Sequence, residues 1–169
     1  MTLEKNPIQK HTVSQALVKA RQTCAYQERC HKEMRNKLYE WGLYQEEVEN
    51  IISTLITENF LNEERFAKTY AGGKFRIKKW GKIKIKQELK KREISDYCIK
   101  KAMLEINDKD YIRTLSELIT KKTLLASGGI KRNKKQSDEK FNLDNYKLAS
   151  YAASKGFEQD LIWDILKNK

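Results

Sequence analysis

The chain has 169 residues and a net charge of +12, and only 39% of its residues are hydrophobic while 34% are charged. This hydrophobic share is low for one deep core and favours several shallow cores, as in an array of short helical units. One proline and seven glycines are too few for the frequent turns of an all-β fold. A net charge of this size attracts polyanions, so nucleic acid, anionic membrane and acidic protein surfaces are the candidate partners.

The sequence also bears on the compartment. No stretch approaches the roughly 18 apolar residues of a membrane span. The first twelve residues contain no apolar core of a signal peptide. The three cysteines, Cys24, Cys30 and Cys98, are an odd number without a disulfide framework. We therefore expect a cytoplasmic protein that does not bind membranes.

Apolar residues recur at helical spacing along most of the chain, for example from Val48 to Ile56 and from Cys98 to Ile106. Asn62, Ser95 and Asn107 each precede acidic residues, which is typical of a helix N-cap followed by a dipole-favoured first turn. The pattern predicts nine helices, over residues 10–27, 29–41, 45–58, 63–77, 82–92, 96–106, 108–125, 138–154 and 158–168.

An internal repeat relates these helices. When Gly42-Leu43, Glu93-Ile94 and Gly156-Phe157 are placed in register, the residues eight before, four before and six after the first member are apolar in all three segments. Amphipathic helices can align by chance, but here the caps and turns agree as well. The repeat predicts an all-α tandem array of three three-helix units, over residues 10–58, 60–106 and 107–169. The apolar positions are Met34, Ile85 and Leu148; Leu38, Leu89 and Ala152; and Val48, Ile99 and Ile162.

Two segments depart from this scheme. Residues 75–86 alternate apolar and basic side chains, which alone would suggest a β-hairpin, but the repeat register favours a helix there. Ile83 fits the apolar face of that helix poorly, so we place it in the first turn. Residues 124–136 form a basic insertion in the third unit that contains Ser127-Gly128-Gly129. This insertion is either a solvated surface loop or a basic arm that orders on a partner.

The segment from Lys74 to Arg92 carries a dense run of cations that only Glu88 opposes. Its helix should turn lysines outward, and its N-terminus should offer free N–H groups to phosphate. Trp80 and Phe75 lie among these cations, where they would either stack on a base or pack in the core. The alternative to an anion-binding surface is a solvated face. The predicted contact residues are Arg76, Lys78, Lys79, Trp80, Lys82, Lys84, Lys86, Lys90 and Lys91.

No residue set supports catalysis. The spacing of Cys24, Cys30 and His31 does not match a structural zinc site. Neither a phosphate-cradling glycine loop nor a catalytic triad is visible. Glu63 and Glu64 are better explained as first-turn acids than as paired catalytic carboxylates. We expect no enzymatic activity, no metal and no cofactor.

Three central segments contain distinctive motifs. Leu61-Asn62-Glu63-Glu64-Arg65-Phe66-Ala67 is an acidic helix start followed by Arg-Phe-Ala, and it resembles the corresponding segment of the RecX family. Lys78-Lys79-Trp80-Gly81 resembles its basic-x-x-Gly segment, and Ile85-Lys86-Gln87-Glu88-Leu89 its Ile-x-x-Glu-Leu helix. The resemblance is strongest over residues 60–106 and weakest over the third unit. Glu93 stands where the family usually has a glycine, which puts the left-handed turn geometry at that position in doubt.

The resemblance implies an elongated, curved array of three-helix repeats without catalytic residues. Such proteins bind the RecA recombinase filament on single-stranded DNA and inhibit its ATPase and strand exchange, within DNA recombination, repair and the SOS response. The implied partners are this filament and single-stranded or double-stranded DNA, contacted directly or through RecA, and we expect a monomer. The alternative is a stand-alone DNA-binding protein without sequence specificity, because phosphate contacts carry no base information.

Overall fold

The computed structural model describes residues 11–126 and 138–168, and in this part of the chain all regular structure is α-helical. The alternating segment 75–86 does not form a β-hairpin. It comprises the end of one helix, a short connection and the start of the next helix. The helices are α1 (Val13–Tyr26), α2 (His31–Glu40), α3 (Gln45–Thr57), α4 (Glu63–Lys78), α5 (Lys82–Lys91), α6 (Asp96–Met103), α7 (Asp108–Ala126), α8 (Asp138–Ser154) and α9 (Gln159–Lys167).

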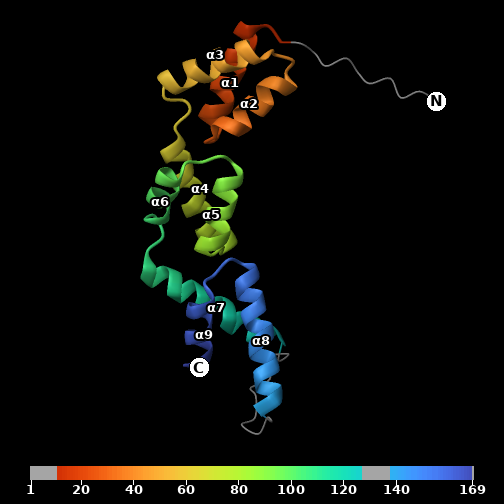
Figure 1. Ribbon diagram of the computed structural model, residues 1–169, viewed down its shortest axis with the longest axis vertical. Helices are drawn as coiled ribbons and strands as arrows, with labels where there is room; N and C mark the ends of the chain where they lie inside the picture. The colour runs from red at the N-terminus through yellow and green to blue at the C-terminus, as the bar shows by residue number, and fades with distance from the viewer. Residues whose placement is uncertain (1–10, 127–137, 169) are drawn as a thin grey trace, which may run out of the picture.

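The helices form three successive units of three along the longest axis of the molecule. Figure 1 shows α1–α3 at one end, α4–α6 in the middle and α7–α9 at the other end, in an elongated and curved arrangement. The second helices of the units, α2, α5 and α8, all lie toward the right of that view. The predicted fold class, an elongated and curved tandem array of three-helix repeats, is confirmed.

The turn between the second and third helix has the same geometry in every unit. Gly42, Glu93 and Gly156 all adopt positive φ, at 86°, 61° and 91°. The N–H of the following residue donates to the carbonyl five residues back, from Leu43 to Leu38 and from Ile94 to Leu89, and the third unit repeats the bond. This is the Schellman arrangement that closes a helix C-terminus. Glu93 therefore keeps the left-handed conformation although it is not glycine.

The predicted N-caps start the helices where expected. The Asn62 side chain accepts from the Arg65 N–H at 2.9 Å, and the Asn107 side chain accepts from the Lys109 N–H at 2.9 Å. Ser95 caps α6 in the same way. Each bond satisfies one of the N–H groups that a helix start leaves without an intrahelical partner.

Most helix ends lie within three residues of the prediction, and two of the differences affect the core or the predicted loop. Helix α6 ends at Met103, and residues 104–106 form a bend that brings Ile106 into the core. Helix α7 continues through Ala126, so the first three residues of the predicted basic loop are helical. Most of that loop, and the start of the first predicted helix, lie outside the described residues.

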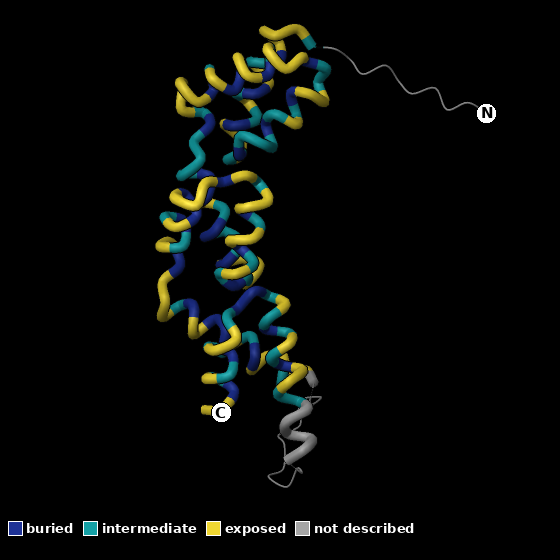
Figure 2. The backbone as a smooth tube through the Cα atoms, in the orientation of Figure 1, coloured by how far each residue is buried: buried dark blue, intermediate teal, exposed yellow. Residues whose placement is uncertain are grey.

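The buried side chains form two clusters rather than one core. The cluster of the first unit runs from Ala16 to Leu61. The second and third units share a continuous cluster that extends from Phe66 to Leu166 and includes Cys30, the N-cap residue of α2. Figure 2 shows buried segments along the inside of each unit, with exposed backbone on the outside. The second and third units are thus fused by packing, whereas the first has a core largely its own.

Arg65 links the first unit to the second. Its guanidinium donates to Glu28 at 2.6 Å, to the Asn59 carbonyl at 2.9 Å and to the Phe60 carbonyl at 3.2 Å. Glu28 belongs to the first unit, and Asn59 and Phe60 form the connection to α4. The Arg65 of the Arg-Phe-Ala segment therefore has a structural role in this chain. Lys32 adds an ion pair with Glu93 at 2.7 Å across the same joint.

Main-chain contacts join the second unit to the third. The Gly81 N–H donates to the Lys155 carbonyl at 2.8 Å, and the Ile83 N–H donates to the Gly156 carbonyl at 3.0 Å. A Cβ on Gly81 would lie 2.1 Å from the Gly156 oxygen. The basic-x-x-Gly segment therefore ends in glycine because two backbones meet there without room for a side chain. This joint also accounts for the poor fit of Ile83 to the apolar face of its helix. The Ile83 main chain bonds to the third unit, while its side chain is 40% exposed.

Candidate nucleic-acid and protein interface

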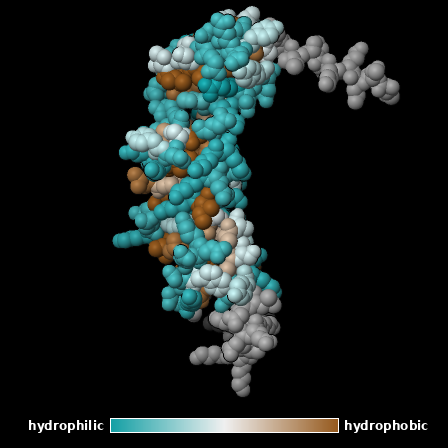
Figure 3. All heavy atoms as spheres, viewed as in Figure 1, coloured by the Kyte–Doolittle hydropathy of each residue, from teal (hydrophilic) through white to brown (hydrophobic). Residues whose placement is uncertain are grey.

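Positive charge is concentrated in the second unit. Residues 60–106 contain 14 Lys and Arg and six Asp and Glu, a net charge of +8. Residues 11–58 contain six Lys and Arg and seven Asp and Glu, a net charge of −1. Figure 3 shows a mostly hydrophilic face with small, separate hydrophobic patches. The unit with the predicted contact residues is therefore the one that would attract a polyanion.

The end of α4 carries three of the predicted contact residues. Arg76 and Lys78 are exposed in its last turn, and Lys79 is exposed at its left-handed C-cap, with φ at 53°. The Arg76 guanidinium lies back against Gly72, where an added Cβ would be 2.7 Å from Nη1. All three cations remain accessible to solvent.

The two aromatic residues of the basic segment have different surroundings. Phe75 is 7% exposed and belongs to the core shared by the second and third units, so the stacking role considered for it is wrong. Trp80 is half-buried against the same core. The ammonium groups of Lys74 and Lys84 lie 5.1 and 4.9 Å from its ring centroid. The Trp80 ring therefore already has two cationic neighbours within the protein. Trp41 and Trp163 also pack against the cores.

Lys82 and Lys84 serve the joint between the second and third units. Lys82 pairs with Asp108 at 2.6 Å and lies 4.8 Å from the Tyr111 ring centroid. Lys84 donates to the Ser154 carbonyl at 3.2 Å. The prediction that Lys84 lies on the outward arc of α5 is therefore wrong, because the third unit covers that side of the helix.

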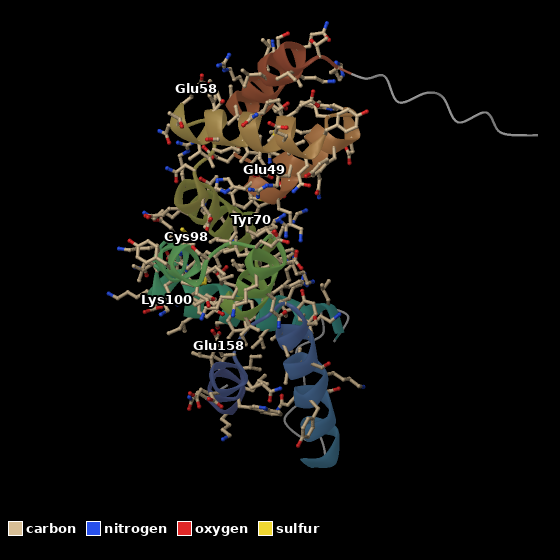
Figure 4. All side chains as sticks on the ribbon, turned by 45° about the horizontal axis from the view of Figure 1, so that its top comes forward. Glu49, Glu58, Tyr70, Cys98, Lys100 and Glu158 are labelled. Atoms are coloured by element: carbon tan, nitrogen blue, oxygen red, sulfur yellow. The ribbon has the colours of Figure 1, made fainter. Side chains whose placement is uncertain are left out.

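The N-terminus of α5 is also occupied. The Lys82 N–H donates to the Tyr111 hydroxyl at 2.9 Å, and that hydroxyl donates to Glu158 at 2.6 Å. Glu158 is labelled in Figure 4, close to where the third unit meets α5. Burial raises the pKa of Tyr111 well above its usual range, and the Glu158 carboxylate adds to this effect. The N–H groups predicted to bind phosphate are thus used inside the protein.

The remaining predicted residues are exposed on α5. Lys86 projects to solvent, Lys90 lies 3.4 Å from Asp96, and Lys91 lies 2.9 Å from Glu88. Pairs at this level of exposure contribute little to stability and exchange readily with solvent ions. These lysines are therefore available to a partner.

Lys100 on α6 belongs with this group, and sequence reasoning missed it. It is exposed and lines the same groove as Lys86 and Lys90. The dense run of cations in the sequence ends at Arg92, so it does not include Lys100. The repeat register could have predicted the place of Lys100, because Lys100 follows Ile99 in the second unit as Glu49 follows Val48 in the first.

The thiols do not form a reactive or metal-binding site in the described residues. Cys24, Cys30 and Cys98 are all buried. Burial raises the pKa of the Cys24 thiol to about 11, which keeps it protonated at neutral pH. In the described part of the chain, no group of three or more His, Cys, Asp or Glu side chains is placed to hold a metal ion. No described helix is long and apolar enough to cross a membrane.

Comparison with known proteins gives a consistent family assignment. The model of the second three-helix domain of RecX matches residues 62–103. The regulatory protein RecX of Clostridium acetobutylicum is 32% identical over 138 residues, which cover 80% of this chain and 60% of the relative. The regulatory protein RecX of Clostridium perfringens strain 13 is 29% identical over 136 residues, which cover 80% of this chain and 59% of the relative. The match thus spans about three-fifths of the length of these relatives.

Solved structures share the fold. The crystal structure of RecX from Lactobacillus salivarius superposes with a TM-score of 0.76 at 24% identity, over 92% of this chain and 95% of that one. The crystal structure of another regulatory protein RecX gives a TM-score of 0.74 at 19% identity, over 93% and 74% of the two chains. Together with the repeated helical units and the Arg-Phe-Ala and basic-x-x-Gly segments, these similarities support the assignment of this chain to the RecX family.

Proposed function

We propose that this protein is a non-catalytic regulator that binds the RecA filament on single-stranded DNA and inhibits its ATP hydrolysis and strand exchange. The concentration of positive charge in the second unit carries the proposal. A net charge of +8 over residues 60–106 suits a polyanionic filament of protein and DNA. The similarity to proteins named regulatory protein RecX supports the same function.

The contact surface of this proposal is narrower than the basic segment as a whole. Lys82 and Lys84 hold the third unit, so their removal would change the shape of the array as well as its charge. The accessible cations are Arg76, Lys78, Lys79, Lys86, Lys90 and Lys91.

The test is a titration of RecA's single-strand-dependent ATP hydrolysis with this protein, alongside a titration of the same DNA without RecA. We expect inhibition well below the protein concentration that coats free DNA. Inhibition only at saturating coverage, with a steep salt dependence, would contradict the proposal. It would favour the second candidate, a stand-alone DNA-binding protein, which the charge of the second unit also supports.

A further inference from the structure

Helices α5 and α6 enclose a groove that is rich in lysine. Its volume is about 310 Å³, and it lies between the second and third helix of the middle unit. Ile99, which is 4% exposed, and the half-buried Met103 provide its apolar residues. Its charged residues are Lys86 and Lys90 from α5 and Asp96 and Lys100 from α6.

The equivalent place in the first unit is closed by an ion pair. Arg35 and Glu49 occupy the positions that Lys86 and Lys100 occupy in the second unit. The Arg35 guanidinium donates two hydrogen bonds to the Glu49 carboxylate, at 2.7 and 3.0 Å, and so spans the gap from α2 to α3. The hydrogen bonds from Arg35 lower the pKa of Glu49. The charges at this place are therefore balanced within the first unit. Glu49 and Lys100 are both labelled in Figure 4.

The equivalent place in the third unit carries no charge of this kind. Ala149 and Trp163 stand at the two positions, and the Trp163 ring meets Tyr146 edge-on with centroids 5.2 Å apart. These residues line a groove of about 360 Å³. The same structural position thus holds an internal ion pair in the first unit, a lysine cluster in the second unit and an aromatic pair in the third.

Only Lys90 of the lysine cluster has an ion pair with a carboxylate of the described residues. Lys90 lies 3.4 Å from Asp96, and both side chains are largely exposed. Among the described residues, no carboxylate lies within 4.0 Å of the ammonium groups of Lys86 and Lys100. The second unit has Lys100 where the first unit has Glu49, so this position holds like charges instead of a closed ion pair, and an external anion would stabilise it.

We propose that the α5–α6 groove binds the phosphate groups of a nucleic-acid strand through Lys86, Lys90 and Lys100. Lysine is a compact charge without fixed hydrogen-bond geometry, which suits phosphates that vary in position. Recognition of carboxylates on a protein surface favours the two-pronged arginine, and no arginine lines this groove. The inference rests on the proposed function and deepens it, since it gives the second unit a direct contact with the DNA of the filament.

The first experiment measures binding of the full chain to a fluorescent single-stranded oligonucleotide without RecA, at several salt concentrations. The triple variant K86Q/K90Q/K100Q should bind roughly tenfold more weakly at about 0.1 M salt. The slope of log affinity against log salt should fall by about 2, because each single-strand phosphate that a lysine neutralises accounts for roughly 0.7 of it. The matched control K109Q/K121Q/K147Q removes the same charge from exposed lysines of the third unit and should change both quantities much less.

A second variant keeps the proposal testable if the triple variant folds poorly. K100E places a carboxylate where the first unit has Glu49, so this carboxylate should pair with the Lys86 ammonium across the groove, through a single charge rather than the two-pronged guanidinium of Arg35. We expect an unchanged or higher melting temperature together with loss of oligonucleotide binding comparable to that of the triple variant.

Wild-type oligonucleotide affinity in both groove variants would overturn the inference. Unchanged oligonucleotide binding with weaker binding to RecA would assign the groove to an acidic protein surface and would overturn it as well. Neither result bears on the proposed function, which is tested separately by the concentration at which the wild-type chain inhibits RecA.

Discussion

Gly81 and Gly73 lie eight residues apart, and their surroundings differ completely. A Cβ on Gly81 would lie 2.1 Å from the Gly156 carbonyl oxygen and 2.4 Å from the Phe157 nitrogen. A Cβ on Gly73, inside α4, would meet nothing within 4 Å. One glycine is therefore required by packing, while the other only weakens a helix by its conformational freedom.

The G81A and G73A variants should shift stability in opposite directions. We expect G81A to lower the free energy of unfolding by about 2 kcal/mol or more, because main-chain atoms must move apart to admit the methyl group. G73A should raise it by about 0.5–1 kcal/mol, because alanine favours the helical backbone. Urea titrations followed by circular dichroism measure both. A neutral G81A would show that the joint between the second and third units is looser than the structure indicates.

The turn after α5 holds Glu93 in a backbone conformation that is unfavourable for any residue with a side chain. Glu93 has a φ of 61°, while its counterparts Gly42 and Gly156 are glycines. The left-handed conformation costs an L-residue roughly 1–2 kcal/mol. The pair of Glu93 with Lys32 offsets part of this cost, but both side chains are largely exposed, which limits its contribution.

Comparison of E93G with E93A isolates the backbone contribution. Both variants lose the ion pair with Lys32, but only glycine relieves the left-handed strain. E93G should therefore unfold with a free energy about 1 kcal/mol higher than E93A, as measured by urea denaturation. Equal stability of the two variants would mean that the turn relaxes when the carboxylate is removed.

At the scale of the whole molecule, the two joints differ in kind. The second and third units share one continuous core and main-chain hydrogen bonds. The first unit has a largely separate core, and Arg65 ties it to the second unit through Glu28 and the carbonyls of the connection. Lysine cannot reproduce these contacts, because it lacks the planar fork of the guanidinium.

R65K should loosen the first joint alone. Spin labels at the repeat-equivalent exposed positions Asn36, Gln87 and Ser150 report on it, since the native cysteines are buried. We expect a broader distance distribution between positions 36 and 87, and an unchanged one between 87 and 150. The control R21K alters a similar arginine pair with Glu58 inside the first unit, and should change neither distribution. Broadening of both distances would contradict a joint-specific role for Arg65.

The helices, their caps and the register of the repeat can be predicted from the amino-acid sequence alone. These features follow from local spacing. Leu38, Leu89 and Ala152 are all fully buried because each stands four residues before a turn that must close onto the core. The caps at Asn62 and Asn107 likewise depend on bonds to residues two or three positions away. Periodicity and capping chemistry act over a few residues, so they can be predicted without knowledge of the fold.

Which cations are available to a partner depends on the fold and could not be predicted from the sequence. Lys82 and Lys84 look like their neighbours in the sequence, but Asp108 and the Ser154 carbonyl, 26 and 70 residues further on, engage them. Lys100 lies outside the basic run and joins it only because α6 packs beside α5. Whether a charge is free depends on groups that folding brings close from distant parts of the chain, and the local pattern contains no information about them.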